Sequence, residues 1–140
     1  MRWGYFWRTV QELAKVGIGA VGTRVLVLGV NFKENCPDLC NSKVFDITEE
    51  LTKYGCEVLV HDPYCDPKEA KAEYGVELIK KVSEIPPVLA IVLAVAHKPF
   101  KQWSPTQWLE RLQAGGIVVD VKGVTPRKEL VDAGVKISRL

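Results

Sequence analysis

The stretch RVLVLGVNFKENCPDLCNS, residues 24–42, decides the fold of this chain. Its first half is an aliphatic run that reaches Val30 and is β-branched at three positions, with Gly22 before it and Asn31 after it. Such a run is typical of a strand that is buried on both faces of a parallel sheet. We therefore expect residues 25–30 to form the first strand, at the centre of the sheet.

The second half of the stretch is a basic, turn-rich loop that leads into a helix. Asn41 and Ser42 are good N-cap residues for a helix that begins near Lys43. In open α/β sheets, ligands bind outside the carboxyl ends of the strands, where backbone N–H groups at helix N-termini favour anions. We therefore expect Lys33, which lies in this loop, at the place where a phosphate would bind.

Strand and helix patterns alternate over the rest of the chain. The aliphatic runs predict further strands over residues 56–62, 88–95, 117–121 and 135–140, with a short strand or edge over 76–79. Cap and stop signals predict helices over 44–54, over 67–74, from Ser104 to near Gly115-Gly116, and from Thr125 as a cap to Gly134. This order predicts the α/β class: one Rossmann-like, doubly wound domain whose mostly parallel sheet has about five to six strands, with helices on both faces.

An amphipathic helix is expected before the sheet, over residues 3–16. Apolar residues recur there at spacings of three and four, with Trp3, Val10 and Leu13 on one face. The aromatic residues in its first two turns need a surface to pack on. Two interpretations stay open: this surface is the domain's own core, or it belongs to a partner chain or a further domain.

Asp62 and His97 follow predicted strands and could have a function. Dinucleotide-binding folds place an acidic residue such as Asp62 on the ribose hydroxyls, but of the required glycine fingerprint only Gly29 is present. With Pro63 beside it, Asp62 more commonly shapes a turn. The His97 ring is expected to bond a nearby loop, because no serine or cysteine can be assigned to it as a nucleophile.

Two lysines are expected at the same edge of the sheet. The strand over 117–121 delivers Asp120, Lys122 and Gly123 to the edge that carries Lys33. Together the two lysines predict a pyrophosphate site, although each alone is more commonly an ordinary surface residue.

Composition restricts the class of protein. The chain has 140 residues, of which 47% are hydrophobic and 26% charged, and this excludes disordered and collagen-like chains. Its net charge of +2 is too small to indicate a nucleic-acid or membrane partner. Cys36, Cys40, Cys56 and Cys65 have no paired metal-ligand spacing, and no apolar run has the length of a membrane span or a signal peptide. We therefore expect free thiols, no metal site and a cytoplasmic protein.

Residues 27–38, VLGVNFKENCPD, resemble the C-terminal, UDP-binding domain of the UDP-glucose/GDP-mannose dehydrogenase family. Within that family, the chain looks most like the bacterial enzymes that act on UDP-N-acetylhexosamines. The resemblance continues through NSKV at 41–44, YGCEV at 54–58, HDP at 61–63, AVAHK at 94–98, DVKG at 120–123 and RL at 139–140. It covers almost everything from about Val21 onward.

Members of this family oxidise the C6 hydroxyl of a nucleotide sugar to a carboxylate, with NAD as hydride acceptor, through a thioester on a cysteine. Their NAD-binding domain and catalytic cysteine precede a long central helix that also forms the dimer, and the C-terminal domain closes over the UDP moiety. The resemblance implies that Phe32 and Lys33 contact the UDP-sugar and that Lys122 lies near a basic position that meets the nucleotide. It implies no catalytic residue and no cofactor site in this chain.

One departure from the family pattern concerns the cofactor. The family commonly has an arginine two residues after the loop aspartate, and there it reaches the cofactor. Here Asp38 is followed at that position by Cys40. A neutral thiol cannot replace a bidentate guanidinium, and this argues against NAD contact through this domain.

The first hypothesis is that residues 21–140 form the UDP-N-acetylhexosamine-binding domain of a UDP-sugar dehydrogenase. In it, residues 1–20 are a remnant of the central helix, and the chain is inactive alone because the NAD-binding and catalytic-cysteine domain is missing. The alternative is an interaction module, in which the N-terminal helix pairs two copies or docks onto a separate catalytic chain and the ligand site is vestigial. A third hypothesis, an independent enzyme that uses His97 or a cysteine, ranks last.

Overall fold

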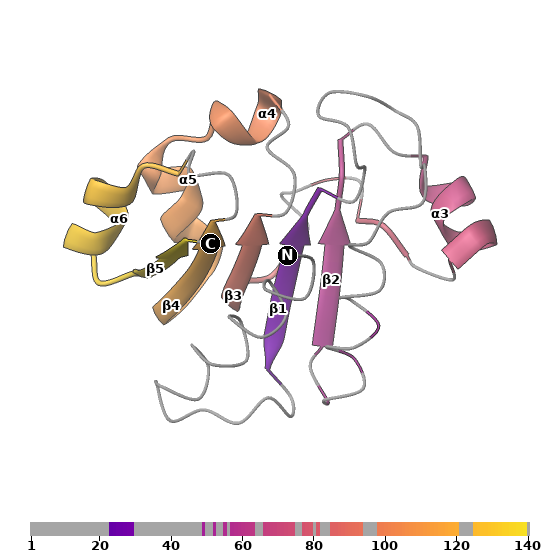
Figure 1. Cartoon of the computed structure of the whole chain (residues 1–140), viewed down its shortest axis with the longest axis horizontal. Helices are drawn as coiled ribbons and strands as arrows, with labels where there is room; N and C mark the ends of the chain where they lie inside the picture. The colour runs from indigo at the N-terminus through magenta and orange to yellow at the C-terminus, as the bar shows by residue number, and fades with distance from the viewer. Residues whose placement is uncertain are drawn as a thin grey trace.

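A computed structural model describes residues 23–29, 49, 52, 55, 57–63, 66–74, 77–79, 81, 85–93, 98–120 and 125–139. Within these ranges five strands form one sheet in the order β2-β1-β3-β4-β5 (Figure 1). The strands are β1 (Arg24–Leu28), β2 (Glu57–His61), β3 (Val88–Leu93), β4 (Leu112–Asp120) and β5 (Lys136–Arg139). All the pairings between them are parallel, which confirms the predicted α/β class.

Strand β1 lies between β2 and β3, and this confirms the prediction of a central strand. Its four aliphatic residues, from Val25 to Leu28, are fully buried, as is almost all of β3. Burial of each large aliphatic side chain contributes roughly 1.5–3 kcal/mol, so these two strands anchor the domain. The short edge expected over 76–79 is a single parallel bridge between Val60 and Leu78.

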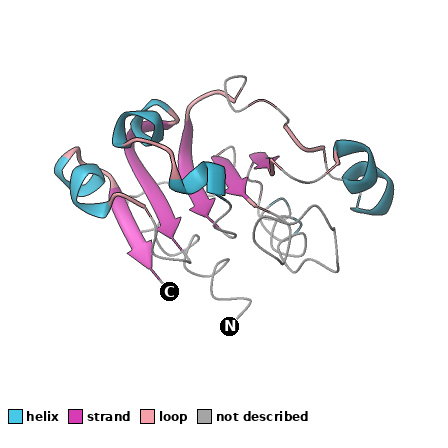
Figure 2. Ribbon diagram, turned by 90° about the horizontal axis from the view of Figure 1, so that it is seen from above, coloured by secondary structure: helices cyan, strands magenta, loops and turns pink. Residues whose placement is uncertain are grey.

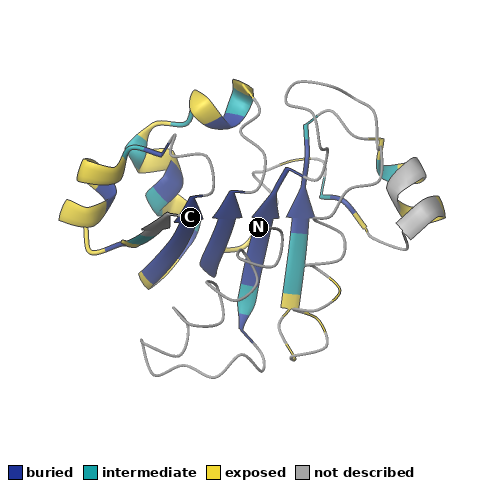
Figure 3. Cartoon of the chain, viewed as in Figure 1, coloured by how far each residue is buried: buried dark blue, intermediate teal, exposed yellow. Residues whose placement is uncertain are grey.

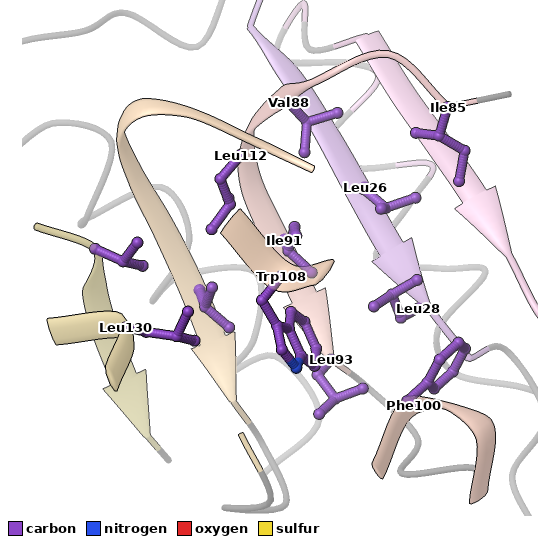
Figure 4. Close-up of a cluster of buried hydrophobic side chains, with 12 residues drawn as sticks. Leu26, Leu28, Ile85, Val88, Ile91, Leu93, Phe100, Trp108, Leu112 and Leu130 are labelled. Atoms are coloured by element: carbon purple, nitrogen blue, oxygen red, sulfur yellow. The ribbon is translucent and has the colours of Figure 1, made fainter. Parts of the chain in front are cut away.

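One cluster of buried hydrophobic side chains joins β1, β3 and β4 to the helices (Figure 4). Side chains alternate between the two faces of a strand, so Leu26 and Leu28 share one face. In Figure 4, Trp108 points toward Ile91 and Leu93. The buried cluster consists of Leu26, Leu28, Ile85, Val88, Ile91, Leu93, Phe100, Trp108, Leu112, Val118, Leu130 and Val135.

The helices with described bounds are α3 (Pro67–Tyr74), α4 (Lys98–Lys101), α5 (Pro105–Glu110) and α6 (Arg127–Asp132). Helices α4, α5 and α6 each contribute one large side chain to the buried cluster, and their other residues are mostly exposed (Figure 3). Helix α3 stands apart from these three (Figure 2). The helix predicted over 44–54 lies largely outside the described residues, and the helix predicted over 3–16 lies entirely outside them.

The prediction that the helix after Ser104 ends near Gly115-Gly116 is wrong. Helix α5 ends at Glu110, and strand β4 begins at Leu112, which pairs with Val88. The register of β3 and β4 then shifts before Ala90, which pairs with Ile117. The two glycines belong to this irregularity: Gly115 has φ of +77°, and a Cβ on Gly116 would lie 2.9 Å from Leu112 Cδ2. The glycines therefore permit a bulge and do not end a helix.

Helix α4 was not predicted, since four residues are too few to show a helical period. The end of α6 was predicted. Gly134 has φ of +94°, its N–H donates to the Val131 carbonyl (3.0 Å), and the Val135 N–H donates to the Leu130 carbonyl (2.9 Å). These two bonds make a Schellman motif, in which glycine tolerates the left-handed conformation.

Candidate functional site

The carboxyl ends of the five strands form one row at the edge of the sheet. Register pairs Leu28 of β1 with His61 of β2 on one side and with Leu93 of β3 on the other. Leu93 in turn pairs with Asp120 of β4. The chain passes from β1 to β2 on one side and later returns to β3 on the other, so the topological switch point lies between β1 and β3. In open α/β sheets, ligands bind at this point.

Gly29 turns the chain out of β1 at the switch point. It is buried, its φ is +87°, and its N–H donates to the carbonyl of His61 (2.9 Å). The left-handed conformation favours glycine, because a Cβ would crowd the backbone there. The turn therefore fixes where the segment with Phe32 and Lys33 leaves the sheet.

His61 is the last residue of β2, and Asp62 follows it. The His61 Nδ1 lies 2.5 Å from the Ile79 carbonyl, and since a carbonyl only accepts, this ring nitrogen carries the proton. The ring also meets the edge of Phe100, with centroids 5.8 Å apart. Asp62 is only 1% exposed, which supports a structural role at the turn over a ribose contact at the surface.

Asp120 ends β4 and has no exposed surface. Its Oδ2 accepts two hydrogen bonds from one residue, the N–H of Thr125 (2.9 Å) and the Thr125 hydroxyl (2.5 Å). The prediction that Thr125 caps the last helix is therefore wrong. The residue before α6 is Pro126, and no side chain caps this helix. The hydroxyl goes to the buried carboxylate, because a buried charge must be hydrogen-bonded.

Aromatic rings from α4, from α5 and from the turn between these helices contact one another in series. Phe100 meets Trp103 edge to face with centroids 5.5 Å apart, and Trp103 meets Trp108 in the same way at 4.8 Å. The Arg111 guanidinium lies 4.5 Å from the centre of the Trp103 ring. Burial lowers the pKa of this guanidinium, and the charge of Glu110 acts in the opposite direction.

The three residues predicted to bind the ligand, Phe32, Lys33 and Lys122, lie outside the described residues. The same holds for His97 and for the four cysteines. Their contacts stay predictions, but the strand ends that precede them in sequence are described. The sequence missed Thr125 as a partner of Asp120, because a helix-cap signal concealed it.

At the described part of the edge, three polar side chains make hydrogen bonds within the chain. His61, Asp120 and Thr125 bond to other groups of their own chain. No group of three His, Cys, Asp or Glu side chains among the described residues could hold a metal ion. Over the same ranges, no helix is long and apolar enough to cross a membrane.

The model of the UDP-binding domain of the UDP-glucose/GDP-mannose dehydrogenase family matches residues 26–127. The chain belongs to this family. Protein CapL of Staphylococcus aureus is 41% identical over 121 residues, and the match covers 86% of this chain and 28% of CapL. The UDP-N-acetyl-D-glucosamine 6-dehydrogenase of Salmonella typhi is 36% identical over 120 residues, with the same two shares. This UDP-binding domain thus spans little more than a quarter of the relatives it matches.

Solved structures confirm the fold of the UDP-binding domain. The NDP-N-acetyl-D-galactosaminuronic acid dehydrogenase of Methanosarcina mazei Go1 superposes with a TM-score of 0.88. It is 23% identical, and the match covers 99% of this chain and 29% of that one. The UDP-glucose dehydrogenase of Pyrobaculum islandicum superposes with a TM-score of 0.67 at 24% identity, covering 97% of this chain and 28% of that one.

Proposed function

We propose that this domain binds a UDP-N-acetylhexosamine at the carboxyl edge of its sheet, through Phe32, Lys33 and Lys122. The observation that carries the proposal is the register of the strand ends. Leu28, Leu93 and Asp120 lie side by side on β1, β3 and β4. The segments that contain Lys33 and Lys122 therefore leave the sheet on either side of β3.

Chain geometry allows both lysines to reach one ligand. Neighbouring strands lie about 4.8 Å apart, so the ends of β1 and β4 are separated by roughly 10 Å. Lys33 follows Gly29 by four residues and Lys122 follows Asp120 by two, and each residue spans at most about 3.6 Å. Both lysines are thus tethered close to the switch point.

The chemistry of the three side chains suits a nucleoside diphosphate. Lysine ammonium groups bind phosphate oxygens as point charges, and two of them offset the charge of a diphosphate. An aromatic side chain such as Phe32 offers an apolar surface to a ring. The N-acetylhexosamine part of the proposal rests on similarity to the dehydrogenase from Salmonella typhi, which acts on UDP-N-acetyl-D-glucosamine.

Calorimetric titration of the full chain with UDP and with UDP-N-acetylglucosamine tests the proposal. Lys33→Ala and Lys122→Ala should each weaken binding by about tenfold or more, since a hydrogen bond to a charged group contributes roughly 1.5–3 kcal/mol. Lys136→Ala is the matched control. Lys136 is exposed and begins β5, at the opposite end of the strands, so the same loss of charge there should leave the Kd within about twofold. No heat at millimolar ligand would defeat the proposal.

We also propose that the chain has no dehydrogenase activity alone. The family chemistry uses NAD and a catalytic cysteine, and the matched region covers only 28% of the Staphylococcus aureus and Salmonella typhi relatives. Incubation with NAD and UDP-N-acetylglucosamine should therefore give no NADH by absorbance. Turnover that a single Cys→Ser change abolishes would contradict this.

The second candidate, docking or dimerisation through residues 1–20, stays a prediction. Light scattering of the chain with and without residues 1–19 measures it directly. A monomer mass that is the same for both forms would remove its basis.

A further inference from the structure

Helix α4 carries positive charge only. Its sequence, residues 98–101, is KPFK, and both of its lysines are exposed. Helices α3 and α6 carry charges of both signs, whereas the sequence has no acidic residue between Glu84 and Glu110. Mixed charges are sufficient to keep a surface soluble. Solubility alone therefore does not explain why the charge on α4 has one sign.

Helix α4 lies at the carboxyl edge of the sheet (Figure 1). The side chain of its Phe100 is buried, and the ring meets the edge of the His61 ring with centroids 5.8 Å apart. His61 ends β2 and pairs with Leu28, the last residue of β1, and Figure 4 shows Phe100 close to Leu28. Phe100 thus fixes α4 beside the ends of β1 and β2, next to the switch point between β1 and β3.

Contacts between aromatic rings hold α4 against α5. The Phe100 ring meets the Trp103 ring at 5.5 Å between centroids, and Trp103 meets Trp108 of α5 at 4.8 Å. The Trp103 N–H also donates to the Phe100 carbonyl (3.2 Å). Lys98 and Lys101 lie on either side of Phe100 in sequence, so their ammonium groups are on the order of 10–15 Å from the ends of β1 and β3. The two charges are therefore held near the switch point.

Charges at this distance act on an anion through the solvent. The Debye length is roughly 30 Å at 0.01 M ionic strength, 10 Å at 0.1 M and 3 Å at 1 M. The attraction between the two lysines and a diphosphate on the order of 10–15 Å away is therefore large in dilute buffer and negligible at about 1 M salt. Replacing either lysine changes the charge that acts on the edge, whatever other groups its ammonium contacts.

We propose that Lys98 and Lys101 steer an anionic nucleotide to the carboxyl edge and raise its association rate, without contacting it in the bound state. This inference rests on the proposed function and deepens it, because it gives a cause for the rate at which the same site is filled. Charge of one sign around a site raises association rates by roughly 10- to 1,000-fold, and two lysines are expected to act near the lower limit. A charge that acts only from a distance leaves the dissociation rate nearly unchanged.

Stopped-flow mixing of the full chain with fluorescently labelled UDP, at ionic strengths of about 0.01, 0.1 and 1 M, gives both rates. Lys98→Gln/Lys101→Gln should lower the association rate about tenfold at the lowest ionic strength and about threefold at the middle one, with no change at the highest. Its dissociation rate should stay within about twofold of the wild type. Arg24→Gln/Lys136→Gln is the matched control, because it removes the same charge from the amino ends of β1 and β5, about 13 Å farther along the strands. At about 0.1 M its association rate should stay within about twofold of the wild type.

The outcomes separate the two proposals. Absence of UDP binding by the wild type in calorimetry would overturn the proposed function and this inference together. Wild-type binding with an unchanged association rate in Lys98→Gln/Lys101→Gln, or with an equal loss in the control, would overturn only the steering role. Faster dissociation that persists at about 1 M salt would mean that a lysine contacts the ligand directly, and steering would again be wrong. If the double variant does not fold, Lys98→Gln and Lys101→Gln are measured singly, and each should lower the association rate about threefold at about 0.01 M.

Discussion

Helices α5 and α6 follow the same sequence signal and use it differently. Ser104 precedes α5, which begins at Pro105, and Thr125-Pro126 precedes α6, which begins at Arg127. At α5, the Ser104 hydroxyl accepts from the Gln107 N–H (3.3 Å), and the Gln107 side chain accepts from the Ser104 N–H (2.8 Å). This is a complete capping box. At α6, the Thr125 hydroxyl donates to Asp120 instead, and no side chain caps the helix.

The difference shows that a hydroxyl bonds the group whose unmet hydrogen bond would cost the most free energy. Ser104 is exposed, and its partner is the N–H group of a helix end that water could also satisfy. Thr125 is buried beside a carboxylate that water does not reach, so the unmet bond would be far more costly there. The residue three positions after Thr125 is Lys128, which has no acceptor to return a capping bond.

The largest effect on stability is expected when Asp120, the acceptor of the Thr125 hydrogen bonds, is replaced. Asp120→Ala leaves the buried N–H and hydroxyl of Thr125 without this acceptor, and each orphaned group costs roughly 1–3 kcal/mol, so the free energy of unfolding should fall by about 3 kcal/mol. Urea unfolding followed by the fluorescence of the buried Trp108 measures it. Asp132→Ala, at an exposed position of α6, should change it by less than about 0.5 kcal/mol. Equal losses in the two variants would mean that the burial of Asp120 is unimportant.

A smaller effect is expected when the cap of α5 is removed. Ser104→Ala deletes the acceptor for the Gln107 N–H at an exposed site, and loss of an N-cap costs about 1 kcal/mol. The same urea titration measures it, and Ser104→Asp, which retains an acceptor, should restore most of the loss. A loss as large as that of Asp120→Ala would contradict the contrast between the exposed and the buried hydroxyl.

These two regions also show how far the sequence predicts the structure. The capping box at Ser104 is a local pattern, and so are the aliphatic runs of β1 and β3 and the glycine that ends α6. The early end of α5 was missed because it depends on a distant strand. The Arg111 carbonyl accepts the N–H of Val88 (2.9 Å), and this bond draws the chain into β4 before any glycine is reached.

The shared edge of the strand ends could be predicted from the sequence, but the hydrogen bonds along this edge could not. Alternating strands and helices fix which ends of the strands share an edge, and the binding of a ligand at that edge stays a prediction. The bonds between Asp120 and Thr125 were missed, because the same threonine and proline also fit a helix cap and only tertiary burial decides between the two. Contacts of Phe32, Lys33 and Lys122 with a ligand stay predictions.

The smallest effect on stability is expected for Lys128→Gln, and it tests whether Asp120 keeps the Thr125 hydroxyl from capping α6. The capping box of α5 needs Gln107, three residues after Ser104. Lys128→Gln places a glutamine three residues after Thr125, and Gln107→Lys removes the glutamine from α5. If local sequence governed the cap, Lys128→Gln would stabilise the domain by about as much as Gln107→Lys destabilises it, roughly 0.5 kcal/mol. Because Asp120 already holds the Thr125 hydroxyl, Lys128→Gln should instead change the free energy of unfolding by less than about 0.2 kcal/mol. In the Asp120→Asn background the acceptor is weaker, and there Lys128→Gln should become stabilising. A gain from Lys128→Gln that is the same in both backgrounds would show that the carboxylate does not compete for the hydroxyl.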